Sequence, residues 1–213
     1  MQTETYWAIV TDNADPDKLN RVRVSKPGEK PGVTDWLPVV TPYASVDAGL
    51  SFIPEIGDQV LVINLEREDI EKTVLGTRWF NKALPPETGE NTEADLNKNG
   101  ENTLRFIKSR SGSQLIFDDT EGKEKIQLIT ADNKTRLEFG LEDNSVRLTT
   151  EHDIKMSSEG SLSFGSEKSR TEITGKKSIK INSGEVINVD AKKSAEIKAG
   201  NGLNKDVKGL TLN

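Results

Sequence analysis

The stretch SIKINSGEVINVDAKKSAEIKAG, residues 178–200, places apolar side chains two positions apart, stops at a polar turn, and starts again eight residues later. Two apolar residues with a polar residue between them are typical of a very short strand with one apolar face. A fixed short period of such strands predicts a solenoid with one strand and one turn in each repeat. This pattern determines the fold class that we expect for the second half of the chain.

The same pairs recur towards the N-terminus as far as residue 115, at steps of 11, 11, 9, 8, 8, 9, 8, 8 and 8 residues. Thr171 and Ala195 fill two of the equivalent positions. We expect the apolar members to form the core of a shaft: Leu115, Phe117, Ile126, Leu128, Leu137, Phe139, Val146, Leu148, Ile154, Met156, Leu162, Phe164, Ile173, Ile179, Ile181, Ile187, Val189 and Ile197.

Two arrangements bury such strands. One chain can coil about three repeats into each rung of a monomeric parallel β-helix, or three chains can wind around one axis as an intertwined triangular prism. Ten strands give a single chain only about three rungs, which is a small core for its surface. This argument favours the three-chain arrangement, while the repeat alone is compatible with both.

The first part of the chain is built differently. All eight prolines, all three tryptophans and both tyrosines lie in residues 1–86. Short segments rich in Val, Ile and aromatic residues alternate there with Pro, Gly and Asp clusters, which predicts a five-stranded Greek-key barrel of the OB type. The chain is therefore expected to be all-β, with a collar domain at 1–80, a linker and start of the shaft at 81–108, exposed over 81–103, and shaft and tip at 109–213.

Composition argues against several functions. The chain has no cysteine, and its charge is −6 over residues 1–108 and zero over 109–213, so neither half offers a basic face for nucleic acid. No apolar run is long enough for a membrane helix, and no export signal begins the chain, which predicts a soluble protein made in the cytoplasm. His152 and the pair Asp118–Asp119 read as surface and turn residues. We expect no cofactor, no metal and no catalytic residue.

Several motifs resemble a known family. The runs DNADPDKLNRVRVSKPG, DWLPVVTPYAS, GLSFIPEIGDQVLVINL and TVLGTRWFNK look like the OB-fold of phage baseplate assembly protein V and of VgrG spike proteins. SGSQLIFDDTEGKEKIQLIT, residues 111–130, looks like the start of the VgrG β-helix. The resemblance covers about residues 5–199 and implies structural roles in the barrel for Trp36, Pro38, Phe52, Pro54, Glu55, Gly57, Asp58 and Gly76.

The resemblance implies a mechanical function rather than catalysis. In that family a homotrimer forms a cell-puncturing spike at the tip of a contractile tail or injection apparatus. The OB-fold end meets a baseplate hub protein, and a PAAR-type tip protein would cap the C-terminal end through Leu210, Leu212 and Asn213. Such a particle assembles in the bacterial cytoplasm and acts at the envelope of a target cell.

The chain also departs from the family. About five residues precede the first expected strand, so we expect the hub to be a separate protein, and residues 81–103 are too few for an inserted lysozyme domain. No histidine follows His152, so the iron-binding His-x-His pair of some short spikes is absent. A monomeric β-helix that acts on or binds carbohydrate is the alternative function. Phage tail, type VI secretion and extracellular injection system are not distinguished.

Overall fold

The computed structural model describes residues 4–26, 28, 35–64, 72–88, 100–196 and 198. All regular structure within these residues is β-structure, as the sequence predicts. The chain divides into two units, Met1–Lys155 and Met156–Asn213. The strands are β1 (Glu4–Asp12), β2 (Arg23–Ser25), β3 (Ala44–Ser45), β4 (Ala48–Gly49), β5 (Gln59–Asn64), β6 (Thr73–Arg78), β7 (Leu104–Lys108), β8 (Gln114–Asp118), β9 (Lys125–Ile129), β10 (Thr135–Gly140) and β11 (Ser145–Thr150).

The first sheet closes into a barrel. Its four strands lie in the order β2-β1-β5-β6, and every neighbouring pair is antiparallel. The segment around Pro38 joins the two outer strands, because Leu37 bridges Val22 in antiparallel fashion and Val39 bridges Val74 in parallel fashion. The ring therefore contains five extended segments, which fits the OB-type barrel that the sequence predicts.

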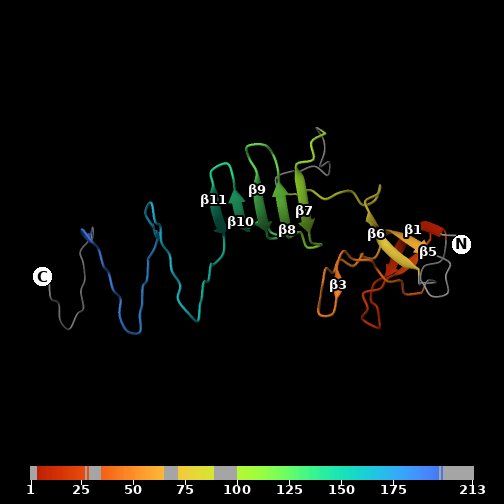
Figure 1. Cartoon of the computed structure of the whole chain (residues 1–213), viewed down its shortest axis with the longest axis horizontal. Coiled ribbons are helices and arrows are strands. Elements are labelled where there is room, and N and C mark those ends of the chain that lie inside the picture. Colours follow the sequence, from red (N-terminus) through yellow and green to blue (C-terminus); the bar gives the residue numbers. More distant parts are fainter. Residues whose placement is uncertain are drawn as a thin grey trace. The chain divides into compact units, whose positions relative to one another are not determined.

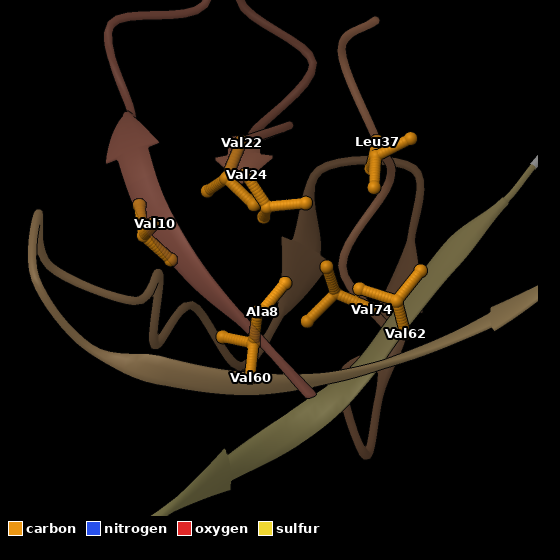
Figure 2. Close-up of a cluster of buried hydrophobic side chains, with 8 residues drawn as sticks. All are labelled: Ala8, Val10, Val22, Val24, Leu37, Val60, Val62 and Val74. Carbon is orange, nitrogen blue, oxygen red and sulfur yellow. The ribbon is translucent and has the colours of Figure 1, made fainter. Parts of the chain in front are cut away.

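Small apolar side chains fill the barrel. Alternate residues of its strands point inward, since side chains along a strand alternate between its two faces. The buried cluster is almost entirely valine, which suits a narrow interior and the β-propensity of branched side chains. Figure 2 shows it: Ala8, Val10, Val22, Val24, Leu37, Val60, Val62 and Val74.

One carboxylate organises the connection between β1 and β2. Asp15 accepts hydrogen bonds from the backbone amides of Asp17, Leu19 and Arg21, and from Nε and Nη2 of Arg21. Its side chain is only 3% exposed. The Arg21 guanidinium, together with these amides, holds the pKa of Asp15 well below its usual range. The negative charge of Asp15 therefore stabilises this loop.

Residues 104–150 form a second sheet, seen as five neighbouring arrows labelled β7 to β11 in Figure 1. Each strand pairs antiparallel with the next one in the sequence, so the sheet is a meander made within one chain. The turns contain residues at positive φ, namely Gly112, Gly122, Asn133 and Asn144. Glycine and asparagine adopt this backbone conformation most readily, and it allows the chain to reverse.

This meander corrects the expected fold between residues 109 and 150. We expected three chains to be intertwined from residue 109, but the hydrogen-bonded ladders up to Thr150 lie within one chain. The reason is the longer steps of 11, 11 and 9 residues, which leave room for hairpin turns. The steps of about eight residues begin only at Ile154. We carry the intertwined arrangement forward only for the residues that follow the sheet.

The residues after the meander have a different character. From residue 151 to residue 196 the chain contains no strand, and every residue is exposed. Figure 1 accordingly draws this stretch as a line without arrows. Extended backbone that is unpaired in one copy leaves its amides and carbonyls available to other strands.

The stretch expected as an exposed linker, residues 81–103, is not exposed throughout. Thr88 is 1% exposed, and Lys108 Nζ of β7 donates a hydrogen bond to the carbonyl oxygen of Glu87. Phe80 and Ala83 also form an antiparallel bridge. The composition of this stretch predicted solvation, but local contacts near β7 bury part of it. Residues 89–99 lie outside the described residues.

Candidate assembly surface

The register of the meander gathers ten side chains on one face. Antiparallel pairing places Ile107, Leu115, Leu128, Leu137 and Leu148 opposite one another in a row across the five strands. A second row, in the same order of strands, contains Arg105, Phe117, Ile126, Phe139 and Val146. We call the first set the leucine row and both rows together the apolar face. With strands about 4.8 Å apart, each row is roughly 19 Å long.

The apolar face is open to solvent in the single chain. Of its ten members, only Leu115 and Leu137 are half-buried, and the rest are exposed. Val146 is the most exposed apolar member, at 67%. Isolated exposed apolar residues are ordinary, but a continuous face of this kind marks an interaction surface.

The opposite face of the sheet satisfies its own polar groups. Gln127 is 1% exposed, and its Nε2 donates to Glu138 Oε2 at 2.5 Å. Arg147 Nη1 lies 3.3 Å from Glu138 Oε1, and Arg136 Nη1 lies 3.8 Å from Oε2. The hydrogen bond from Gln127, assisted by Arg147, holds the pKa of Glu138 below its usual value. The polar face is therefore internally neutralised, and the apolar face is the one that lacks a partner.

A groove runs along the leucine row. It has a volume of about 980 Å³, and its wall includes four members of that row that belong to β8–β11, together with Ile107 of β7. Phe52 and Ile53 from the barrel line the other side. At its rim, Arg110 Nη1 lies 3.2 Å from Glu55 Oε2. The groove is apolar along its length and charged at this edge.

The remaining core residues expected in the shaft lie in the stretch without strands. Those from Ile154 to Val189 are all exposed in the single chain, which is consistent with burial only in an assembly. Ile197 lies outside the described residues, as do the expected tip contacts Leu210, Leu212 and Asn213. Their roles stay predictions.

The motif around residue 57 forms a tight turn of the barrel. The Glu55 amide donates to Asp58 Oδ2 at 2.9 Å, and the Asp58 amide donates to the Glu55 carbonyl at 3.0 Å. Gly57 has a φ of +97°, which is accessible to glycine at little cost, and its amide donates to the Val10 carbonyl. Pro54 is buried beside this turn. The motif thus joins the loop to β1.

The other barrel residues singled out by the sequence lie apart from one another. The guanidinium of Arg23 lies 4.8 Å from the ring of Trp36, and the carbonyl of Pro38 accepts from the Val74 amide. Gly76 lies in β6. Phe52 is 64% exposed and points away from the valine cluster, whereas the neighbouring Ile53 packs against that cluster. We expected barrel packing for Phe52, and its exposure leaves it free to line the groove.

Comparison with known families supports the barrel assignment. Residues 6–79 match the family model of the type VI secretion system/phage-baseplate injector OB domain. The match runs from β1 to just after β6, so it spans the whole closed ring. No curated protein matches the chain. The likeness to an injector OB domain is therefore established for the barrel, and the residues after Trp79 are interpreted from their own structure.

The residues weighed for chemistry have structural surroundings. Asp118 Oδ1 accepts from the amide of Thr120 at 3.0 Å and from its Oγ1 at 2.6 Å, which is an Asx-type turn. His152 is exposed, with Nε2 3.7 Å from Asp132 Oδ2. Within the described ranges, no group of three metal-ligating side chains occurs. The part of the chain that the structure describes also contains no helix that could cross a membrane.

Sequence reasoning missed two parts of this surface. Ile107 extends the leucine row onto β7, but the consecutive apolar residues Phe106 and Ile107 do not reveal which of them faces the row. The hairpin of β3 and β4 was also missed, because each strand is two residues long. The sequence signal for the hairpin is the run of apolar residues between Tyr43 and Ile56, interrupted by Asp47 and Gly49.

Proposed function

We propose that this chain is the structural, non-catalytic spike of a contractile injection apparatus, and that it works as a homotrimer. The injector OB domain forms the collar, the meanders of three copies face one another across the axis, and the following octads intertwine into the shaft. The match of the barrel supports a role in a baseplate or injector. The number of three copies rests on the resemblance of the motifs to spike proteins.

The observation that carries this proposal is the exposed apolar face of the meander. Three such faces turned inward would form a prism with a dry interior and charged outer walls. Each wall satisfies its own ladder, except at the edge strands β7 and β11. The octads after Thr150 would take their hydrogen-bonding partners from other copies, which explains why no ladder forms within one chain.

The surface area supports assembly as well. The single chain exposes 18117 Å² of accessible surface. A compact monomer of 23.5 kDa would expose roughly 9,800 Å² by the scaling of surface with mass. A chain that exposes so much surface is marginal on its own and gains stability by burying it between copies.

The partners follow from this architecture. A baseplate hub protein would hold the collar, a PAAR-type protein would cap the C-terminal end, and the target cell envelope would be the surface that the spike crosses. Force along the axis would be resisted by many backbone hydrogen bonds acting together, which suits a part that transmits contraction. The particle would assemble in the bacterial cytoplasm and act outside the cell that made it.

The mass of the folded chain tests the proposal. Light scattering or native mass spectrometry of the purified protein should give three times 23.5 kDa. A stable, folded protein with the mass of one chain would overturn the spike and would favour a single-chain β-helix instead. A mass of two chains would also contradict the prism, since two faces would form a sandwich.

A further inference from the structure

The β3–β4 hairpin and the loop after it carry an unusual number of exposed apolar side chains. Five large apolar residues within fourteen positions are exposed, namely Tyr43, Val46, Leu50, Phe52 and Ile56. Val46, at the tip of the hairpin, is 88% exposed. We call these five residues the hairpin patch. Clustered exposure of this kind indicates contact with another molecule.

The hairpin is held in a defined conformation. The Leu50 amide donates to the Tyr43 carbonyl at 2.9 Å, and Thr41 Oγ1 donates to the Leu50 carbonyl. A Cβ added at Gly49 would lie 2.9 Å from the Tyr43 oxygen, so only glycine allows the strands this close approach. Asp47 turns the tip at a φ of 56°. An element that is rigid before contact loses little entropy on docking.

The groove along the leucine row offers a complementary surface. It is lined by apolar side chains of the meander, and Phe52 of the hairpin patch forms part of its wall. The hairpin patch is thus continuous with the surface that we assign to contacts between copies. At the rim, the side chain of Arg110 is 83% exposed, while the tip of the hairpin carries the acidic Asp47 beside Val46.

We propose that the β3–β4 hairpin of one copy docks in the groove of a neighbouring copy. Val46 contacts the leucine row, and Asp47 faces Arg110 across the subunit boundary. The groove of the same chain is not the acceptor, because Val46 is almost fully exposed in its own copy. The inference rests on the proposed homotrimer and adds a contact that links the collar of one copy to the meander of the next.

Site-directed crosslinking tests the contact, and the absence of cysteine from the chain makes it clean. Val46→Cys combined with Leu128→Cys, at the centre of the row, should form disulfides between chains and give linked chains on a non-reducing gel. Bridging requires Cα atoms within about 7 Å. The matched control is Val46→Cys with Val146→Cys, which exposes its side chain more but lies in the other row and outside the groove wall. The control should stay unlinked.

A charge exchange gives a second measurement that does not alter the core. Asp47→Arg should weaken assembly roughly tenfold, because three exposed pairs are lost in each trimer. Asp47→Arg together with Arg110→Asp should restore most of that loss. Each variant is compared with the parent by its midpoint concentration of dissociation in sedimentation velocity.

The outcomes separate this inference from the proposed function. A parent with the mass of three chains, with links only through Leu128, supports both. A trimeric parent that gives no link, or a disulfide confined to single chains, overturns hairpin docking and leaves the spike standing. A parent with the mass of one chain overturns both.

Discussion

A charge placed on the apolar face should prevent assembly, while the same charge one residue later should not. Leu148 and Thr149 are neighbours on β11, and both are exposed in the single chain. Leu148 lies on the leucine row, whereas Thr149 lies opposite Arg136 on the polar face. Leu148→Asp and Thr149→Asp therefore add one carboxylate to the same strand, on opposite faces of the sheet.

The magnitude follows from the exposed part of the side chain. Complete burial of a leucine stabilises by about 1.5–3 kcal/mol, so burying the 51% of Leu148 that is exposed contributes about 1 kcal/mol per chain. Three chains give about 3 kcal/mol, which is roughly a hundredfold in the assembly constant. Leu148→Ala should cost most of this. Leu148→Asp adds several kcal/mol per chain for an unpaired buried carboxylate, and assembly should be lost.

Sedimentation velocity over a range of concentrations measures both changes, and circular dichroism confirms that β-structure remains. The parent and Thr149→Asp should sediment as three chains, and Leu148→Asp should sediment as one. If Leu148→Asp and Thr149→Asp assembled equally well, the apolar face would not be the contact between copies, and the reasoning from register to prism would be wrong.

Three further predictions concern other parts of the chain. Ile181→Asp should abolish the heat resistance of the assembled shaft, whereas Lys180→Asp should retain it; equal melting temperatures would refute the inward position of Ile181. Asp15→Asn should flatten the acid dependence of barrel unfolding: the folded pKa of Asp15 is depressed, so its stabilisation is complete above the unfolded pKa of about 4 and disappears as pH falls towards the folded value. Gly49→Ala should disrupt the hairpin and lower the Val46 crosslinking yield, whereas Gly76→Ala, with no atom within 4 Å of the added methyl group, should leave the yield unchanged.

The acid prediction has its own check. Chemical unfolding of parent and variant is followed between about pH 5 and pH 2, the range in which a depressed carboxyl binds its proton. Parallel curves for the two proteins over this range would show that the loop charge at Asp15 does not contribute to the stability of the barrel.

Much of the fold could be predicted because strand periodicity is a local property. Residues two apart share a face in any strand, so Leu115 and Phe117 point the same way whether their strand belongs to a meander or to a helix of three chains. The valines of the barrel alternate for the same reason. The pairs assigned to the shaft as far as Leu148 indeed lie on one face of the sheet.

The partners of each strand could not be read in this way. Whether β8 pairs with β9 of its own chain depends on turn conformations at residues such as Gly122, and the longer steps were the signal that went unused. Closure of the barrel depends on the bridge between Val39 and Val74, which are far apart in the sequence. The position of Phe52 depends on where the hairpin directs the loop.

The sequence by itself thus determined the all-β class, the OB-type barrel and the set of apolar side chains that alternate along the second half. Only the tertiary structure decided that residues 104–150 form a sheet within one chain and that its apolar face is left open beside an exposed hairpin. The physical reason is that side-chain alternation repeats every two residues along one strand. Pairing, in contrast, is set by hydrogen bonds and turn geometry between residues that the local pattern does not connect.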